Sequence, residues 1–328
     1  MQCFLVEQLD DDTIQQSVTD QPTERLPEGN LLVQVEWSSL NYKDALAASG
    51  HPGVVRTFPH VPGIDAAGTV LESDDPALPT GSQVVVTGYE MGSARWGGWS
   101  ELIRVPASWA VPLPESLSTR EAMALGTAGF TAALSIQALE HNHVRPDSGP
   151  IAITGASGGV GSLAIRMLAG LGYEVIAVSR KAQADEQLRG WGAADCWTPE
   201  KLIDKADRAL LKADLAGAID TVGGDLLAAT LRRCQQHGCV AACGMAASDK
   251  LNMTVFPFIL RGVKLSGIDS SQTPADSRVQ IWNRLAGELK PAQLNEDVQV
   301  LQLEQLEQTA QQMLDGTTTG RTIVQIAS

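Results

Sequence analysis

The spacing of hydrophobic residues changes about a third of the way along the chain. Before Pro114, short runs rich in β-branched residues occur at 31–37, 67–71 and 83–87, and Gly, Pro, Asp and Asn separate them. Runs of this kind predict short strands. Their succession is typical of a small, mostly antiparallel barrel or twisted sheet rather than a helical bundle.

After Pro114, extended and helical patterns alternate. Residues 119–139 predict a helix, and apolar residues from Val160 to Leu171 recur at helical spacing until Gly172 supplies a stop. Short apolar runs predict strands at 151–154, 175–178, 218–222, 239–243 and 263–268. Because strands that alternate with helices form doubly wound parallel sheets, we expect an α/β chain with a Rossmann domain.

The last segment predicts helices near 275–289 and 303–314 and a strand at 320–326. A terminal strand needs a sheet to pair with, and the N-terminal barrel is the expected host.

Composition limits the kind of partner. The 328 residues suit about two domains, and 44% hydrophobic residues can fill their cores. The net charge of −14 argues against nucleic acid or an anionic membrane as the main partner. The chain has five cysteines and no C-x-x-C pair, which suits a reducing compartment. The N-terminus does not predict a secretory signal. We therefore expect a cytoplasmic protein. The uncharged runs 122–139 and 148–165 contain several Gly, Ser and Thr, so we do not expect them to span a membrane.

A glycine-rich turn, Gly155–Gly161 (GASGGVG), lies between a predicted strand and a predicted helix. In that context small residues let the backbone approach a pyrophosphate, and the N–H groups of the helix start hold the phosphates. The turn therefore predicts a dinucleotide site. Ala156 departs mildly from the usual pattern, and an ordinary strand-to-helix turn is the alternative.

The next strand ends in Ser179-Arg180-Lys181. An acidic residue there would bind a ribose 2′-hydroxyl, whereas a hydroxyl and two cations suit a 2′-phosphate. We therefore expect NADPH as the cofactor. The alternative is that both cations are solvated surface charges.

The histidines do not form a metal-binding pattern with cysteines or carboxylates; they are His51, His60, His141, His143 and His237. We expect no metal, and chemistry that consists of the cofactor's own hydride transfer.

With these motifs the chain resembles the zinc-free quinone oxidoreductase branch of the medium-chain dehydrogenase/reductase superfamily, and within it the acrylyl-CoA reductase subgroup. Ile64-Asp65 stands where zinc enzymes of the superfamily have His-Glu. The resemblance extends over nearly the whole chain and is carried by stretches at 37–45, 62–68, 96–98, 126–132, 155–161, 218–223, 241–244, 257–261, 267–270 and 320–322. It implies a GroES-like catalytic domain at 1–121 completed by 271–328, and an NADPH-binding Rossmann domain at 122–270.

The resemblance also implies a cofactor-binding set, whose members are Tyr42, Thr131, Ser157, Gly158, Gly159, Val160, Ser179, Arg180, Lys181, Met245, Ile268, Ser270 and Arg321. Tyr42, Met245 and the strand end at 267–270 are expected to border the nicotinamide, and Arg321 to reach the cofactor from the C-terminal strand. The subgroup more often has glycine where Arg180 stands, which leaves open whether Arg180 or Lys181 makes the main 2′-phosphate contact.

The implied reaction is NADPH-dependent reduction of acryloyl-CoA to propionyl-CoA, with Asn41, Tyr42 and Asp65 as catalytic candidates. Asn41 could donate a hydrogen bond to substrate or cofactor, Tyr42 could orient the ring or relay a proton, and Asp65 could position either of them or only tie its own turn. A rim of Lys43, Arg56 and Arg95 is a further hypothesis for coenzyme A. The alternatives are a quinone or alkenal/enone oxidoreductase, or a non-catalytic NADPH-binding protein. The resemblance implies a homodimer joined at the strand 263–268.

Overall fold

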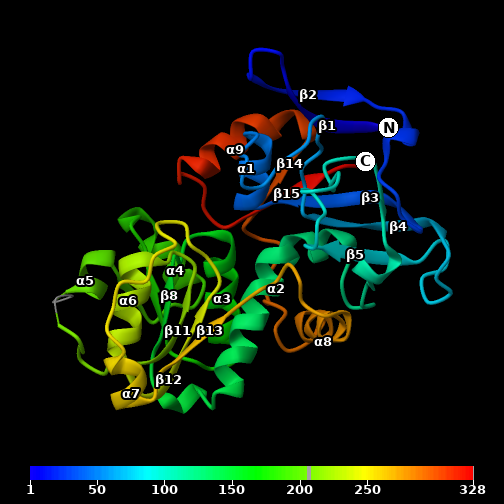
Figure 1. Cartoon of the computed structure of the whole chain (residues 1–328). Helices are drawn as coiled ribbons and strands as arrows, with labels where there is room; N and C mark the ends of the chain where they lie inside the picture. Colours follow the sequence, from blue (N-terminus) through cyan, green and yellow to red (C-terminus); the bar gives the residue numbers. More distant parts are fainter. Residues whose placement is uncertain (205–207, 328) are drawn as a thin grey trace. The chain divides into compact units, whose positions relative to one another are not determined.

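The computed structural model describes residues 1–204 and 208–327, which form two compact units (Figure 1). The first unit comprises Met1–Thr127, Ser270–Gly287 and the segment from Ala292 onward. The second comprises Ala128–Asp269 and Glu288–Pro291. The chain thus leaves the first unit after Thr127 and returns to it at Ser270.

The main sheet of the first unit has seven strands. Six of them follow the order β14-β15-β3-β4-β5-β7, and the seventh, β6, pairs with β3. Its strands are β3 (Leu31–Leu40), β4 (Asp65–Ser73), β5 (Gln83–Thr87), β6 (Leu102–Val105), β7 (Ala110–Pro112), β14 (Val298–Leu301) and β15 (Arg321–Gln325). All pairings are antiparallel except that of β14 with β15. The strands predicted at 31–37, 67–71, 83–87 and 320–326 are confirmed. The terminal strand does join this sheet, because Thr322 pairs with Leu40.

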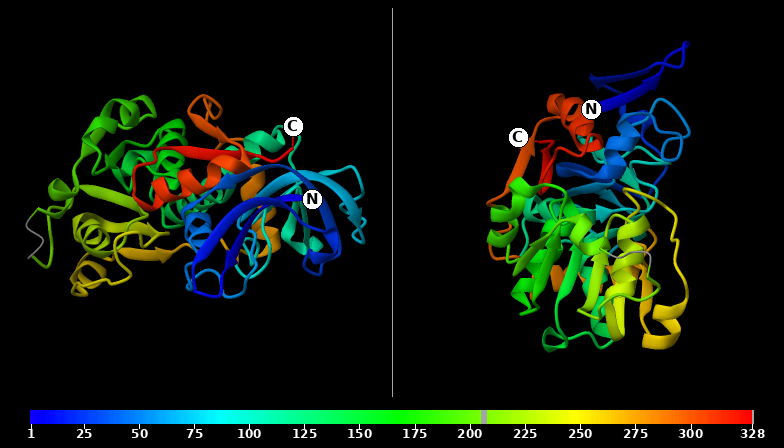
Figure 2. Two further views of the ribbon diagram at one scale, coloured as in Figure 1. Left: turned by 90° about the horizontal axis from the view of Figure 1, so that it is seen from above. Right: turned by 90° about the vertical axis from the view of Figure 1, so that its left-hand side faces the viewer.

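The core of this sheet follows from the alternation of side chains along each strand. Leu31, Val33 and Val35 of β3 point to one face and pack with Val84 and Val86 of β5. A second core lies under the hairpin β1 (Gln2–Gln8) and β2 (Ile14–Asp20), the helices α1 (Tyr42–Ala48) and α9 (Leu306–Leu314), and the 3₁₀ turn η5 (Leu303–Gln305). The unit also contains helix α8 (Ala275–Ala286) and the 3₁₀ turns η1 (Thr23–Arg25) and η2 (Ala107–Trp109). Figure 2 shows the hairpin at the edge of this unit. The hydrophobic pattern predicted neither the hairpin nor β14.

Two predicted helices differ at their ends. The helix expected at 275–289 stops at Ala286, where Gly287 is the C-cap. The helix expected from residue 303 begins with one 3₁₀ turn before α9 starts at Leu306.

The second unit contains a six-stranded, all-parallel sheet with the order β10-β9-β8-β11-β12-β13. The strands of the sheet are β8 (Ile151–Thr154), β9 (Val175–Val178), β10 (Asp195–Trp197), β11 (Leu215–Asp220), β12 (Cys234–Ala242) and β13 (Lys264–Gly267). The unit also contains the helices α3 (Gly159–Gly170), α4 (Asp185–Gly190), α5 (Pro199–Ile203), α6 (Gly224–Arg233) and α7 (Phe256–Arg261), and the 3₁₀ turns η3 (Pro146–Ser148) and η4 (Ala182–Ala184). The predicted doubly wound sheet is confirmed. Strands β8 and β9 are buried along their full length, as expected where helices cover both faces of a parallel sheet.

Helix α2 (Thr119–His141) passes from the first unit into the second. It is long and apolar enough to cross a membrane, but 78% of its most apolar window is buried inside the protein, as in a core helix. The predicted helix at 119–139 is confirmed, with one interruption. Gly126 has φ 51° and ψ −157°, so a kink lies next to the boundary at Thr127.

Candidate active site

The turn before α1 is fixed by a capping box. Asn41 is the N-cap, and its backbone N–H donates a hydrogen bond to the side chain of Asp44 at 2.8 Å. The other carboxylate oxygen of Asp44 accepts from the backbone N–H groups of Gly63 and Ile64, at 3.2 and 2.7 Å. Asp44 therefore ties the start of α1 to the segment that leads into β4.

Asp65, the first residue of β4, is fully buried and accepts four hydrogen bonds. The donors are the hydroxyl of Ser39 at 2.6 Å, the amide of Asn41 at 2.8 Å, and both the backbone N–H and the hydroxyl of Thr127, at 2.9 and 2.6 Å. Asp65 thus does more than tie its own turn, because it connects β3, the start of α1 and the kinked helix α2.

Arg321, the first residue of β15, is 4% exposed and completes this network. Its guanidinium donates to the carbonyls of Met123 and Ala124 and to Oδ1 of Asn41, at 3.1, 2.9 and 3.1 Å. A Cβ on Gly126 would lie 2.6 Å from Oδ2 of Asp65 and 2.8 Å from Nη2 of Arg321. The carboxylate and the guanidinium therefore flank the kink, and a side chain larger than hydrogen would displace one of them.

The charges of this network are unequal, since the buried cation Arg321 faces two buried carboxylates. Burial and the charge of Asp65 raise the pKa of Asp44 to about 7, although the backbone N–H donors oppose that shift. Burial lowers the pKa of Arg321, and the charges of Asp65 and Asp44 counteract it. A proton on Asp44 leaves one carboxylate for one guanidinium, which is the cheaper arrangement in a medium of low dielectric constant.

The catalytic candidates differ in availability. The amide nitrogen of Asn41 has two protons and lies within 3.1 Å of three acceptors, on Ser39, Asp44 and Asp65. Its oxygen accepts from Arg321, so Asn41 would have to give up a protein contact before donating to substrate. Tyr42, the first residue of α1, has 47% of its surface exposed and can reach a ligand.

The glycine-rich turn of the second unit fits a pyrophosphate. Helix α3 begins after Gly158, whose position as N-cap carries no side-chain hydrogen bond, so the N–H groups of its first turn are open to a ligand. A Cβ on Gly161 would lie 2.4 Å from the carbonyl oxygen of Gly155, which explains the need for glycine where the helix meets the strand. Ser157, Gly158, Gly159 and Val160 all lie at this turn.

The end of β9 brings Ser179 beside the same turn, with its hydroxyl 3.5 Å from that of Ser157. The backbone N–H of Lys181 donates to the Ser179 hydroxyl at 3.1 Å, and Arg180 is exposed. Burial lowers the pKa of Lys181, and the charge of Arg180 lowers it further. Two neighbouring cations are thus gathered next to the glycine turn, as a bound phosphate requires.

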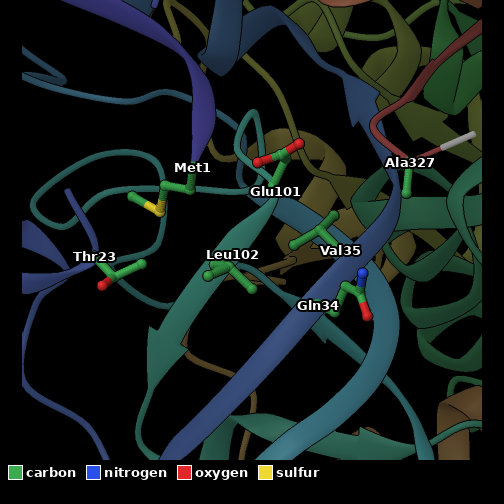
Figure 3. Close-up of a pocket in the computed structure, with 7 residues that line it drawn as sticks. All are labelled: Met1, Thr23, Gln34, Val35, Glu101, Leu102 and Ala327. Atoms are coloured by element: carbon green, nitrogen blue, oxygen red, sulfur yellow. The ribbon is translucent and has the colours of Figure 1, made fainter. Parts of the chain in front are cut away.

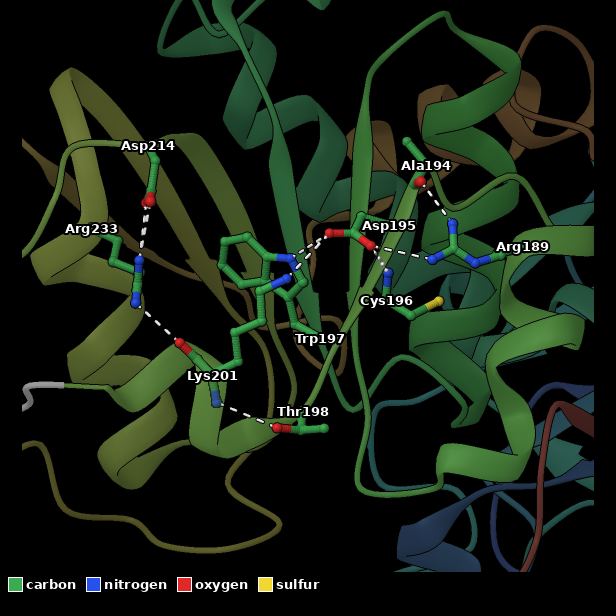
Figure 4. Close-up of polar contacts among 9 residues, drawn as sticks. All are labelled: Arg189, Ala194, Asp195, Cys196, Trp197, Thr198, Lys201, Asp214 and Arg233. Carbon is green, nitrogen blue, oxygen red and sulfur yellow. Dashed lines mark hydrogen bonds and ion pairs between the residues drawn. The ribbon is translucent and has the colours of Figure 1, made fainter.

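The backbone of Ser179 also pairs with β10, because its N–H donates to the carbonyl of Trp197 at 3.1 Å. Around Trp197 lies a polar cluster (Figure 4), in which the Trp197 indole donates to Asp195 and Lys201 lies over the ring. This cluster braces the strand next to the basic segment.

The remaining predicted cofactor residues after α1 are spread over several elements. Thr131 is buried in α2, and Met245 is 71% exposed in the loop after β12. The N–H of Ile268 donates to Ala242, just after β13 ends. Ser270 belongs to the first unit.

Sequence reasoning missed Asp220 as well as Asp44. Asp220 is fully buried at the end of β11, where it accepts from the hydroxyl of Thr154 at 2.6 Å and from the N–H of Gly223 at 2.7 Å. It joins the ends of β8 and β11 beside the glycine turn. An isolated aspartate at the end of an apolar strand was the available signal.

Of the three cations suggested to bind coenzyme A, one is already engaged by protein groups. The guanidinium of Arg95 donates to the carbonyl of Glu28 and lies 5.5 Å from the centre of the Trp109 ring, so protein groups already engage it. Arg56 is exposed and Lys43 partly exposed.

A pocket of about 260 Å³ lies elsewhere in the first unit (Figure 3), lined by Met1, Thr23, Gln34, Val35, Glu101, Leu102 and Ala327. It contains none of the predicted site residues. Within residues 1–204 and 208–327, no group of three or more His, Cys, Asp or Glu side chains is arranged to hold a metal ion.

Two family models match the chain. The alcohol dehydrogenase GroES-like domain matches residues 27–115, and the zinc-binding dehydrogenase domain matches residues 159–285. With the full-length relatives described next, these matches show that the chain belongs to the medium-chain dehydrogenase/reductase family and is an oxidoreductase.

Three relatives extend over nearly the whole chain. "Probable acrylyl-CoA reductase AcuI" of Escherichia coli (strain K12) is 45% identical over 99% of this chain and 100% of its own length. YhfP of Bacillus subtilis (strain 168), named for quinone oxidoreduction, is 44% identical over 93% of this chain and 92% of its own, and its structure with NAD bound has a TM-score of 0.96. The YhdH oxidoreductase of Salmonella enterica in complex with NADP is 43% identical, with a TM-score of 0.97 and full coverage of both chains.

Proposed function

We propose that this chain uses NADPH to reduce the C=C bond of an α,β-unsaturated acyl-CoA, converting acryloyl-CoA to propionyl-CoA. The observation that carries the proposal is the identity of 45% to AcuI over the full length of that relative. The cations at the end of β9 support NADPH over NADH, as does the NADP complex of the 43%-identical relative.

When bound, NADPH supplies a hydride for the β-carbon of the enoyl thioester. In this proposal Ser179, Arg180 and Lys181 hold the 2′-phosphate, and the N–H groups at the start of α3 hold the pyrophosphate. Tyr42, Met245, Ile268 and Ser270 border the nicotinamide.

The chain's own residues must stabilise the negative charge that develops on the thioester oxygen and deliver a proton to the α-carbon. Tyr42 is suited to the second task, since it carries an O–H and is half exposed. Asn41 and Asp65 act through position, because their hydrogen bonds fix the turn from which Tyr42 projects.

Replacement of Tyr42 by Phe removes the O–H but keeps the ring. We expect kcat with acryloyl-CoA to fall by about 10²–10⁴-fold, the usual contribution of a positioned proton donor, with little change in NADPH affinity. Steady-state rates and NADPH fluorescence titration measure the two effects. Unchanged turnover with normal NADPH binding would remove Tyr42 from the chemistry.

The similarity to YhfP favours a second candidate, reduction of a quinone or an alkenal or enone. An NADPH-oxidation assay over enoyl-CoAs, small quinones and enones, repeated with NADH, separates the candidates. We expect the highest kcat/KM with acryloyl-CoA and NADPH. A higher value with a quinone, or equal use of NADH, would contradict the proposal, and failure of bound NADPH to be oxidised in a single turnover by any of them would indicate a binding protein.

We also propose a homodimer formed through β13. This strand is at the edge of its sheet, and apolar side chains near it are exposed, among them Ile259 at 72%, Leu260 at 60% and Leu265 at 38%. An open edge strand beside an apolar surface is suited to pairing with a second copy. Sedimentation at micromolar concentration should give a dimer, and Ile259→Lys with Leu260→Lys should give a monomer. Val300→Lys, at an exposed apolar residue of the first unit, is the matched control.

A further inference from the structure

Arg278 is a buried arginine that the proposed chemistry does not use. It lies in α8 and is 1% exposed. One nitrogen of its guanidinium, Nη1, donates to the carbonyl and the hydroxyl of Thr87 at 2.7 and 2.9 Å, and the other, Nη2, donates to the carbonyls of Ser270 and Ser271, both at 3.1 Å. One side chain thus joins the end of β5 to the segment 270–271.

Further contacts tie the same two segments. The backbone N–H of Tyr89 donates to the carbonyl of Ser271 at 3.0 Å, and the hydroxyl of Ser271 donates to the carbonyl of Tyr89 at 3.1 Å. The guanidinium of Arg278 lies 4.3 Å from the centre of the Tyr89 ring, which in turn stacks on Trp109. Burying a guanidinium is costly unless its donors are satisfied. Nη1 and Nη2 of Arg278 together make four hydrogen bonds, so the side chain attaches the two segments at several points.

The attached segment has a particular place in the chain. Strand β13 ends at Gly267, and Ser270 is the first residue of the first unit after the chain leaves the second. Cofactors of doubly wound sheets bind beyond the carboxyl ends of the strands. The segment 268–270 at such an end holds two of the residues assigned to the nicotinamide, Ile268 and Ser270, and Arg278 contacts the backbone of the second.

We propose that Arg278 is a positioning residue for the nicotinamide end of the cofactor. It fixes the backbone at Ser270 and Ser271, and thereby the surface that the nicotinamide contacts, without touching the cofactor itself. The inference rests on the proposed NADPH site, but not on the proposed substrate.

The test compares two ligands by titration. NADPH occupies the whole site, whereas adenosine 2′,5′-bisphosphate contains only its adenosine end. For Arg278→Met we expect the Kd of NADPH to rise about tenfold and that of the bisphosphate to stay within about twofold, because the lost contacts lie at the nicotinamide end. The emission enhancement of bound NADPH fluorescence should also decrease. Equal changes for the two ligands, or no change for either, would overturn the proposal.

Arg233→Met is the matched control. Arg233 is also buried and also donates to two carbonyls, those of Lys201 and Leu202, and it forms an ion pair with Asp214. It lies in the second unit beside the cluster that braces β10 (Figure 4). Loss of this arginine should change the affinities of NADPH and the bisphosphate together. A selective loss of NADPH affinity in this control would contradict our assignment.

If the Arg278→Met protein does not fold, the Thr87→Val variant tests the same inference. This substitution removes one acceptor of Arg278 and keeps the shape of the side chain, so NADPH affinity should fall by a smaller factor, about two- to threefold, with the bisphosphate unaffected. Unchanged NADPH affinity in a folded Thr87→Val protein would refute the inference. If the wild-type protein prefers NADH, the cofactor proposal fails by itself, and the same comparison is made between NADH and 5′-AMP.

Discussion

The polar sites of the two units consist of different groups, side chains in the first unit and mainly backbone N–H groups in the second. In the first unit the site consists of side chains. Hydrogen bonds join Asn41 to Asp44, Asp65 and Arg321 in a charged network that is largely buried. In the second unit, the glycine turn offers backbone N–H groups at the start of α3, and of the cations beside it Arg180 is exposed and Lys181 partly exposed.

This difference predicts different responses to substitution. A buried charge network loses much of its stability when one member is removed, since the remaining charges lack compensation. A backbone cradle keeps its donors whatever the side chains are, and is sensitive mainly to steric obstruction. Substitutions in the network of the first unit should therefore lower the free energy of unfolding, whereas substitutions in the glycine turn of the second unit should lower ligand affinity.

The largest effect is expected for Asp65→Ala. It removes the acceptor of four hydrogen bonds and one of the carboxylates that balance Arg321, so the free energy of unfolding should fall by about 3–5 kcal/mol. Urea denaturation measures it. Glu72→Gln, which breaks only an exposed ion pair with Arg104, should cost less than about 1 kcal/mol. Similar losses in both variants would remove the contrast between buried network and surface.

Gly161→Ala tests the steric half of the comparison. The new methyl group would meet the carbonyl oxygen of Gly155, so α3 must shift, at a cost of about 1–3 kcal/mol. Because the shift moves the N–H groups that hold the pyrophosphate, NADPH affinity should fall as well. Gly170→Ala, at a position of the same helix where a Cβ meets nothing within 4 Å, is the control.

Lys181→Ala and Arg180→Ala show which cation binds the 2′-phosphate. Loss of the main contact should weaken NADPH binding by about 1.5–3 kcal/mol, or roughly 10- to 100-fold, and leave NADH binding nearly unchanged. We expect the larger effect at Lys181, whose backbone is held by Ser179. Parallel losses for NADPH and NADH would show that neither cation reads the phosphate.

A further effect concerns pH. The pKa of Asp44 is raised to about 7 in the folded protein, from an ordinary value of 3.8. The folded state therefore holds a proton between these values that the unfolded state has lost, and this contribution to stability, complete below about pH 4, is lost as the pH rises through 7. Asp44→Asn should flatten the fall in stability between pH 5 and 7. An unchanged slope in urea denaturation would mean that Asp44 is ionised throughout.

The contrast also explains what the sequence could predict. The glycine turn, β8, β9 and the basic segment are contiguous, and their spacing alone places them, so these strands are predicted to the residue. The network of the first unit joins residues 39–44, 65, 126–127 and 321, and no local spacing encodes their meeting. Asp44 and Arg278 were missed because a single charged residue in a helix has the pattern of a surface residue until its burial is known.

The pairing of β15 with β3 has a consequence for synthesis. The second unit comes almost entirely from one continuous stretch, whereas residues 37–40 of β3 obtain their neighbour at residues 322–325, some 280 residues later. At about 5–20 residues per second, a ribosome needs on the order of tens of seconds to supply it. The unit that begins first is thus completed last, and until β15 is made the growing chain carries an unpaired edge on residues 37–40 of β3.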